Sequence, residues 1–325
     1  MLLNLSLIIP HQNQSDELNL LFDSIIKLND FPSEIIIVDS SSKPLSVIQK
    51  FEDFCSSHQI SLVILRGDNL YPGHARNLGI TKASYPILAF LDTQTLPENN
   101  WLSSYNDLIQ NEDLDGILGS TLYEAQTFQE KVIRGATYGC KPITTLPGSI
   151  LRKSIFYKTG VFLPNTRAGE DADWMERTRL FGIKFDLSSS YLSYRGLFSV
   201  SSSAILKKWH RNYIHTSKLT FFKPHRDFYL YMFFIFLIVI AYNWNSVVAS
   251  WDPANDLYIP NITKIMFGTL ALLYAFVRGM LMPLKKGVQL AFLFPFGFIS
   301  ILLISFLIDL VKFFAFTQTK LTTLR

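Results

Sequence analysis

Over the first 100 residues, short apolar runs alternate with stretches in which apolar residues recur every three or four positions. The short runs have the length of buried strands, and the longer period between them predicts helices, the first of them capped by Ser15. Strands and helices in this rhythm predict an α/β domain with a mixed, mainly parallel sheet and helices on both faces. The apolar runs span residues 5–9, 34–38, 60–65 and 87–91.

Polar residues follow three of these predicted strands, at residues 10–13, 39–41 and 92–94. Ligands of open α/β sheets bind at the carboxyl ends of the strands, so these residues predict a nucleotide site. The first strand is not followed by G-x-G-x-x-G, and the chain has no P-loop. Both absences disfavour ordinary dinucleotide or ATP binding.

Three carboxylates, Glu170, Asp171 and Asp173, fall within four residues behind Gly169 and ahead of a predicted helix at residues 174–181. A glycine allows a sharp turn, and acids are favoured at a helix N-terminus. One of them can serve as a general base toward a bound hydroxyl. Ordinary helix capping is the alternative interpretation.

The C-terminal part of the chain is predicted to be a helical membrane region. Residues 228–251 and 287–308 contain no charged side chain, and residues 265–282 contain only Arg278. A bilayer is crossed by about 20 apolar residues, so each segment is a candidate span. We expect an integral, multi-pass protein with two or three such helices. Two alternatives to a third span are that Pro295 makes the third segment re-enter the membrane, or that the segment broken by Arg278 lies in the membrane interface.

Charge divides the chain into three parts. Residues 1–202 carry 17 Lys/Arg against 22 Asp/Glu and form the predicted catalytic domain. Residues 203–226 carry six Lys/Arg and no acid, which predicts a basic, aromatic juxtamembrane segment in contact with membrane lipids on the cytoplasmic face. Residues 227–325 form the transmembrane region. The net acidic first part disfavours nucleic acid as a partner.

With these features assembled, the chain resembles the family 2 glycosyltransferases from about residue 5 to residue 213. Each motif alone is weak, but six stand in the family's order. The motifs lie at residues 6–10, 35–41, 73–79, 90–97, 148–153 and 169–177.

This resemblance implies a GT-A-like, nucleotide-sugar-binding fold and inverting transfer from a nucleoside diphosphate sugar. By position, Pro10 and Asp39 would contact the base and ribose with Arg76 nearby, and Asp92 would lie at the nucleotide or its metal. Asp171, in the pair with Glu170, would be the general base. The acceptor side of the site would include Gly148, Ser149, Asp173, Trp174 and Trp209.

The chain departs from the family pattern where a metal ligand is expected. Gln94 stands for the second acid of the D-x-D motif, and Arg195 stands where a histidine ligand is often found. An amide oxygen is a weaker partner for a hard cation than a carboxylate. Asp92 therefore remains the single candidate ligand for Mg²⁺ or Mn²⁺, and we expect Arg195 to replace part of the metal's charge at the diphosphate.

Trp209 stands where processive synthases of the family carry Q-x-x-R-W, but only the tryptophan matches, with Lys208 in the arginine's place. The poor match favours single-sugar transfer over processive synthesis. The resemblance and the apolar segments together lead us to expect an enzyme of the inner or plasma membrane, with its catalytic domain in the cytoplasm, that extends a lipid-linked or cell-surface glycan. The alternative is a membrane protein that binds nucleotide sugar or glycan without turnover. A transporter is disfavoured, because Arg278 is the one charge in the apolar segments.

Overall fold

The computed structural model describes residues 1–196, 202–219 and 224–323, and the chain divides into two compact units. The first unit comprises Met1–Thr127 and Cys140–Ile205, and the second comprises Phe128–Gly139 and Leu206–Arg325. The second unit thus includes residues 128–139, which the sequence placed in the catalytic domain. Within the predicted basic segment 203–226, residues 220–223 lie outside the described residues.

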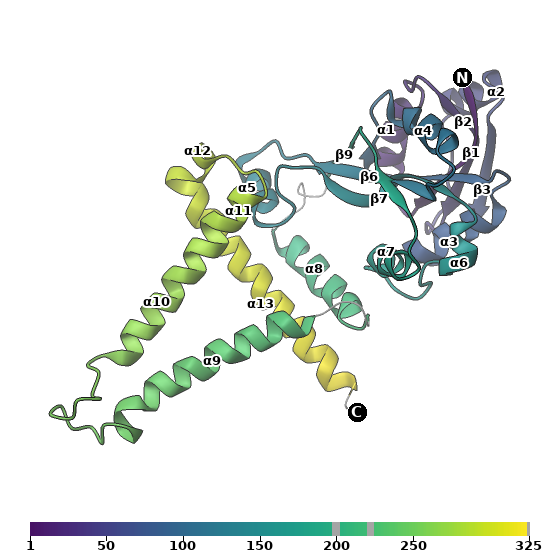
Figure 1. Cartoon of the computed structure of the whole chain (residues 1–325). Helices are drawn as coiled ribbons and strands as arrows, with labels where there is room; N and C mark the ends of the chain where they lie inside the picture. The colour runs from purple at the N-terminus through teal and green to yellow at the C-terminus, as the bar shows by residue number, and fades with distance from the viewer. Residues whose placement is uncertain (197–201, 220–223, 324–325) are drawn as a thin grey trace. The chain divides into compact units, whose positions relative to one another are not determined.

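One sheet forms the centre of the first unit, with nine strands among the described residues (Figure 1). Its strands are β1 (Leu2–His11), β2 (Phe31–Asp39), β3 (Ser61–Arg66), β4 (Ile87–Phe90), β5 (Thr95–Leu96), β6 (Gly116–Tyr123), β7 (Ile143–Arg152), β8 (Phe185–Leu187) and β9 (Leu192–Tyr194). β3, β2, β1 and β4 lie side by side and run parallel. β7 pairs antiparallel with β4 and β6, while β8 and β9 run parallel to β6 and β5 runs antiparallel to β9. The mixed, mainly parallel sheet predicted from the sequence is confirmed.

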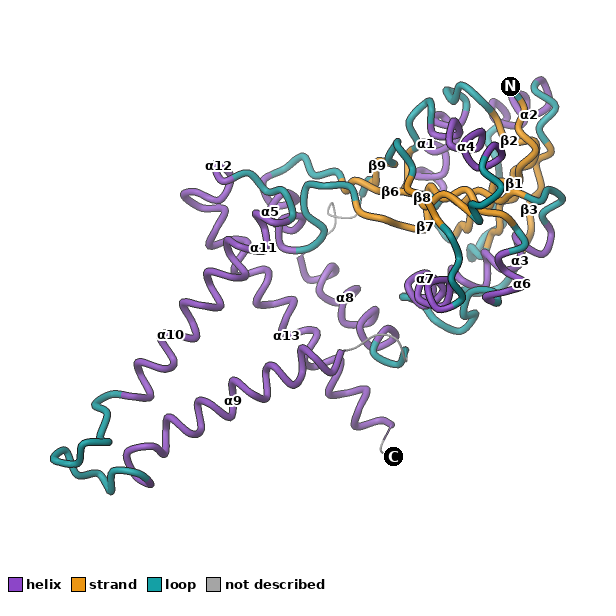
Figure 2. The backbone as a smooth tube through the Cα atoms, in the orientation of Figure 1, coloured by secondary structure: helices purple, strands orange, loops and turns teal. Residues whose placement is uncertain are grey.

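Helices pack on both faces of this sheet, as Figure 2 shows. Leu7 of β1 belongs to one core with Phe22 and Phe51, whose rings stack at 3.9 Å, whereas Ile8 belongs to a second core with Trp174. Successive strand residues therefore face opposite layers, as the two-residue period of a strand requires. The helices of this unit are α1 (Ser15–Ile25), α2 (Gln49–Ser57), α3 (Pro72–Lys82), α4 (Ser104–Gln110), α6 (Ile155–Thr159) and α7 (Glu170–Leu180), with a 3-10 turn at Trp101–Ser103.

β1 continues through Pro10, where the sequence predicted its end. The carbonyl of Ile8 accepts a hydrogen bond from the amide of Leu91, so Ile8 presents its backbone toward the β4 side. Residues two apart in a strand present their backbone to the same side, and β4 ends at Phe90, the partner of Ile8. The nitrogen of Pro10, which carries no hydrogen, therefore faces a position beyond the end of β4. No hydrogen bond between strands is lost there.

The second unit is helical in its described residues. Its helices are α5 (Phe128–Ala136), α8 (Ser202–Thr216, which begins in the first unit), α9 (Pro224–Val247), α10 (Ile262–Phe276), α11 (Met282–Lys285), α12 (Leu290–Phe292) and α13 (Phe298–Thr323). A π-helical turn, Val277–Leu281, joins α10 to α11. A second such turn, Leu293–Gly297, joins α12 to α13 and contains the non-helical residue Phe294 before Pro295.

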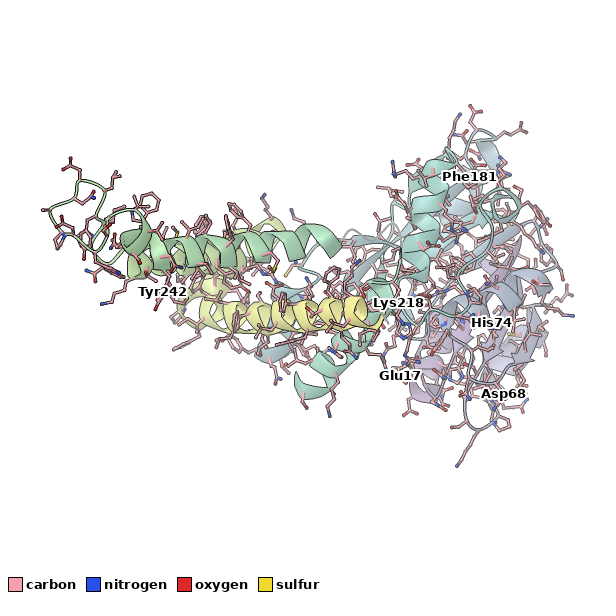
Figure 3. The ribbon with its side chains drawn as sticks, turned by 90° about the horizontal axis from the view of Figure 1, so that it is seen from below. Glu17, Asp68, His74, Phe181, Lys218 and Tyr242 are labelled. Carbon is pink, nitrogen blue, oxygen red and sulfur yellow. The ribbon has the colours of Figure 1, made fainter. Side chains whose placement is uncertain are left out.

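Two helices of this unit, Ile262–Lys285 and Leu290–Thr322, are long and apolar enough to cross a membrane, and Met232–Val247 is a shorter apolar helix among the residues searched. Large side chains on these helices are exposed: Leu272 by 74% and Tyr242, labelled in Figure 3, by 70%. Contiguous exposed apolar surface of this kind marks an interaction with lipid or protein.

Candidate active site

The strand order places the candidate site at the carboxyl ends of β1, β2 and β4. β2 and β3 lie on one side of β1 and β4 lies on the other, so the order reverses at β1. Asp39 is the last residue of β2, and Asp92 follows the end of β4 by two residues. Because ligands of open α/β sheets bind at such a switch point, both aspartates lie where the sequence predicted a site.

Asp39 is buried and surrounded by donors. Its Oδ1 accepts hydrogen bonds from His11 Nδ1 at 2.9 Å and from the Ser41 amide at 3.0 Å, and its Oδ2 accepts from the Leu45 amide at 3.0 Å and from Arg66. Burial raises the pKa of Asp39, but the hydrogen bonds from Ser41, His11 and Leu45 outweigh it and hold the pKa well below its usual range. The carboxylate is ionised and its lone pairs are occupied. Arg66 is the partly exposed donor of this set, with 39% of its side chain accessible.

His11 supports this arrangement, a role that the sequence did not predict. Its Nε2 accepts a hydrogen bond from the Gln14 amide at 3.2 Å, so the proton of the neutral ring is on Nδ1, which donates to Asp39. The ring is only 3% exposed. His11 is therefore a buried residue that orients the Asp39 carboxylate through this hydrogen bond.

Arg76 connects the two ends of the site. Its Nη1 donates to Glu170 Oε1 at 2.7 Å and its Nη2 donates to Asp92 Oδ1 at 2.8 Å, and its guanidinium lies 5.8 Å from the centre of the Phe162 ring. Burial lowers the pKa of Arg76, but the charges of Asp92 and Glu170 raise it by more, so the group stays cationic. The sequence predicted Arg76 beside the base and ribose. In the structure Arg76 lies between the carboxylates of Asp92 and Glu170 and is 4% exposed.

The loop after β4 is held by hydrogen bonds within the loop and to two neighbouring segments. Thr95 Oγ1 accepts from the Asp92 amide at 3.0 Å, and Gln94 Oε1 accepts from the Tyr194 hydroxyl at 2.5 Å. Thr93 Oγ1 donates to Gln14 Oε1 at 2.5 Å. These bonds fix the position of Asp92 while engaging the amide oxygen of Gln94.

The residues present fit a cation only in part. Asp92 Oδ1 accepts a hydrogen bond from Arg76, and none of the hydrogen bonds described above involves Asp92 Oδ2. The amide oxygen of Gln94 already accepts a hydrogen bond from Tyr194. In the part of the chain that the structure describes, no group of three or more His, Cys, Asp or Glu side chains is placed to hold a metal ion. A divalent cation here would therefore take Asp92 as its protein ligand and further oxygens from the donor's diphosphate and water.

The acid pair lies at the start of α7, as the sequence predicted. Gly169 precedes the helix with φ +87°, a conformation that favours glycine, and Glu170, Asp171 and Asp173 all lie in the first turn. Burial raises the pKa of Glu170, Arg76 lowers it and Asp171 raises it, with a net increase. Asp171 is half-buried, and its Oδ1 accepts from the Ala172 amide at 2.8 Å.

Gly73 explains how α3 approaches α7 closely enough for Arg76 to reach Glu170. A Cβ atom at Gly73 would lie 2.5 Å from the Leu163 carbonyl oxygen and 3.0 Å from Glu170 Cγ. The first of these atoms belongs to the backbone of Leu163 and cannot move aside easily. The glycine of this motif therefore permits the close packing on which the bridge depends.

Two residues of α7 that were predicted to contact the acceptor, Trp174 and Asp173, make contacts within the first unit. Trp174 was expected to face an acceptor, but its side chain is 0% exposed, stacks on Phe156 and donates to Thr159 Oγ1 at 3.1 Å. That prediction is wrong, because a side chain with no accessible surface cannot touch an acceptor. Asp173 is held by Arg177, whose Nε lies 2.9 Å from its Oδ2.

The other acceptor-side residues lie elsewhere. Gly148 and Ser149 are buried in β7: Ser149 Oγ accepts from the Gly119 amide at 2.9 Å, and the Gly148 carbonyl accepts from Trp101 Nε1 at 2.8 Å. Ser149 Oγ also donates to the Thr145 carbonyl at 3.1 Å, so the described hydrogen bonds of both residues stabilise the fold of the first unit. Trp209 is a half-buried residue of α8 in the second unit.

Arg195 is placed beside the loop after β4 by strand pairing. Its amide donates to the Gln94 carbonyl at 3.0 Å, while its Nε donates to Glu124 Oε2 at 2.9 Å. The side chain is 53% exposed. The structure thus brings the Arg195 backbone next to Gln94 and gives its side chain a partner, Glu124, that the sequence did not indicate.

Four polar residues of the site escaped the sequence analysis: Gln14, Arg66, Glu124 and Tyr194. Each bonds a residue that the sequence analysis did name, at a separation of 27 to 100 positions: Arg66 bonds Asp39, Glu124 bonds Arg195, Gln14 bonds Thr93 and Tyr194 bonds Gln94. Tyr194 was adjacent to the singled-out Arg195, but the partner of its hydroxyl is set by the pairing of β5 with β9. No local pattern could have revealed these contacts.

The model of the family described as glycosyl transferase family 2 matches residues 6–170, about half of the chain. The chain belongs to glycosyltransferase family 2. The match covers the ends of β1, β2 and β4 and extends to Glu170, so it includes both partners of Arg76.

Among curated relatives, a stretch of this family 2 glycosyltransferase is 28% identical over 116 residues to a chondroitin synthase of Pasteurella multocida (strain Pm70). The matched stretch is 34% of this chain and spans only 12% of the synthase. Among solved structures, the mannosyltransferase PcManGT from Pyrobaculum calidifontis, in complex with GDP-Man and Mn²⁺, aligns with a TM-score of 0.52 at 14% identity, covering 93% of this chain and 87% of the other. TarS 1-349 of S. aureus, in complex with UDP-GlcNAc, aligns with a TM-score of 0.45 at 15% identity over 95% and 90% of the two chains. At 14% identity the mannosyltransferase supports the fold alone.

Proposed function

We propose that this protein transfers a sugar from a nucleoside diphosphate sugar to a hydroxyl of a glycan or lipid-linked acceptor, with inversion and one sugar per encounter. The observation that carries the proposal is the bridge by which Arg76 joins Asp92 to Glu170. It ties the loop at the nucleotide end of the site to the helix that begins with the acid pair. Membership of family 2 and the position of Asp39 support the donor class.

In this mechanism Asp171 is the general base. It takes the proton of the acceptor hydroxyl while the hydroxyl oxygen forms a bond to the anomeric carbon and the bond to the diphosphate breaks. Inversion needs one base on the face opposite the leaving group and no protein nucleophile. Asp171 lies in the first turn of α7, and Glu170, tied to Arg76, fixes the start of that helix.

A divalent cation, if bound with the donor, would supply positive charge at the departing diphosphate. Asp92 is the residue that would hold it, and the Mn²⁺ present in the complex of PcManGT is in keeping with that chemistry. Arg195 lies beside the same loop through Gln94 and adds a basic group there.

We further propose that the second unit anchors the enzyme in the cell membrane. The two long apolar helices, the exposed side chains on them and the six cations of residues 203–226 support this placement. A basic segment directly before a span marks the cytoplasmic side, so the catalytic domain would face the cytoplasm.

The test uses the full chain, purified in detergent, with a panel of nucleotide sugars and an assay of released nucleoside diphosphate. Asp171→Asn is expected to lower turnover by at least about 100-fold while nucleotide binding persists. Asp186→Asn is the matched control, because Asp186 Oδ1 accepts from the next amide as Asp171 does, at 2.7 Å, but lies exposed on β8. Equal turnover in the two variants would refute Asp171 as the base.

A protein that binds nucleotide sugar without turnover is the second candidate. This candidate is favoured because Gln94, which stands for the second acid of the D-x-D motif, already accepts a hydrogen bond from the Tyr194 hydroxyl. In the same assay this candidate predicts saturable binding of a donor and no released nucleoside diphosphate with any sugar or acceptor.

A further inference from the structure

The side-chain amide of Asn77 on α3 is hydrogen-bonded to the backbone of Phe162 at both ends. Its Nδ2 donates to the Phe162 carbonyl at 2.8 Å, and its Oδ1 accepts from the Phe162 amide at 3.0 Å. Phe162 lies in the irregular segment between α6 and α7. Asn77 therefore supplies, from 85 positions away, the backbone hydrogen bonds that a helix or strand would supply to this residue.

The ring of Phe162 packs between three parts of the first unit. It is 1% exposed, and its centre lies 5.3 Å from the Trp174 ring on α7 and 6.1 Å from the Phe90 ring at the end of β4. The guanidinium of Arg76 lies 5.8 Å from the same centre. The backbone that Asn77 holds thus carries a side chain in contact with α3, α7 and β4.

These contacts lie close to both ends of the candidate active site. Phe90 precedes Asp92 by two positions, and Trp174 follows Asp171 by three positions, within one turn of α7. Close-packed side chains transmit a displacement to their neighbours. A shift of the Phe162 backbone would therefore move the start of α7 relative to the loop after β4.

We propose that Asn77 is a positioning residue for sugar transfer, and that through Phe162 it sets the place of Asp171 relative to the bound donor. This inference rests on the proposed function, because it takes Asp171 as the general base. Donor binding depends on Asn77 less, since His11 and two backbone amides of its own segment hold Asp39. Loss of the Asn77 amide should therefore lower kcat more than it raises the KM for the donor.

The experiment measures donor turnover by the full chain in detergent. Asn77→Ala removes both hydrogen bonds. Asn77→Asp keeps the shape of the side chain, but its carboxylate places an acceptor against the Phe162 carbonyl oxygen. When protonated, the same carboxyl group can donate to that carbonyl and still accept from the Phe162 amide.

Asn245→Ala is the matched control. Asn245, in the second unit, makes the same pair of hydrogen bonds to one backbone residue: its Nδ2 donates to the Ile259 carbonyl at 2.8 Å, and its Oδ1 accepts from the Ile259 amide at 3.0 Å. This variant shows what the loss of such a pair does to turnover when the residue is remote in sequence from the acid pair and the nucleotide loop.

Asn77→Ala is expected to lower kcat by about 100-fold, the loss that a misplacement of roughly 1 Å can cause, with a donor KM within about threefold of the wild type. Asn245→Ala should leave kcat within about threefold of the wild type. In hydrogen exchange, peptides covering residues 162–174 should exchange faster in Asn77→Ala, and peptides covering residues 34–45 should not change.

A kcat of Asn77→Ala within about threefold of the wild type, in an enzyme that Asp171→Asn inactivates, would overturn the positioning role and leave the proposed function intact. An equal fall of kcat in Asn245→Ala would overturn it as well, because the effect would then be a general one of lost stability. A wild-type chain that turns over no donor would overturn both. If Asn77→Ala is not monodisperse with a normal melting transition, Asn77→Asp decides: its kcat relative to the wild type must rise between pH 8 and pH 5, and an equally low ratio at both would refute the role.

Discussion

Replacing Arg76 by methionine tests the link between the two ends of the candidate active site. Methionine keeps much of the length and removes the charge, which leaves Glu170, 5% exposed, without its cation. Removing one partner of a buried ion pair costs about 3–5 kcal/mol. For a unit of this size each kcal/mol lowers the melting temperature by about 2–4 °C, so we expect a loss of about 6–20 °C.

The loss should depend on pH, because the pKa of Glu170 is already raised and Arg76 opposes that rise. Without Arg76 the pKa of Glu170 rises further. A carboxyl group with a raised pKa contributes stability below its unfolded pKa and loses it as pH rises through the folded pKa. The variant should therefore lie closer to the wild type at pH 5 than at pH 8.

The assay is thermal unfolding of the full chain in detergent, followed by tryptophan fluorescence at both pH values. The double variant Arg76→Met/Glu170→Gln removes the unpaired carboxylate and should recover part of the lost stability, mainly at pH 8. A melting temperature within about 2 °C of the wild type, or a double variant no more stable than Arg76→Met, would refute the bridge.

Three further predictions address other residues. Asp39→Asn should weaken UDP or GDP binding at least tenfold by calorimetry, because the ionised acceptor is lost, and an unchanged dissociation constant would move the nucleotide elsewhere. Arg195→Ala should lower transfer more than moderate chelation does in a radiolabelled-sugar assay, and abolition by EDTA with a neutral Arg195→Ala would establish a conventional metal site. Trp174→Ala should destabilise the fold by about 3–5 kcal/mol, whereas Tyr157→Ala, 83% exposed on α6, should change the melting temperature little; similar shifts would contradict the buried role of Trp174.

Local patterns were sufficient for much of the fold. Continuous apolar runs marked β1, β2 and β4, because strands covered on both faces are apolar throughout, and they marked the more exposed edge strand β3 as well. The start of α7 followed from a glycine and three acids, which satisfy the backbone geometry and the dipole of a helix N-terminus within five residues. The end of β1 was placed too early, since the cost of Pro10 depends on whether a neighbouring strand reaches that position.

The assignment of Trp174 shows why side-chain roles were less predictable. Its place in the motif indicated an acceptor contact, yet the same residue is on the face of α7 that packs against Phe156 and Phe162. A short helix with mixed polarity gives little indication of which face is buried. Likewise, residues 128–139 lie between two strands of the first unit but pack within the second, where Gly135 meets Ile301.

The sequence by itself determined the first four strands and the helices between them, the six motifs of family 2, the position of the acids at a helix start and the apolar C-terminal segments. Each of these depends on residues a few positions apart. Only the tertiary structure decided which charges meet. Arg76 and Glu170 are 94 positions apart, and Arg278 and Asp309 are 31 apart on different helices. An ion pair requires two side chains within about 4 Å, and that distance is set by sheet order and helix packing, which no local pattern contains.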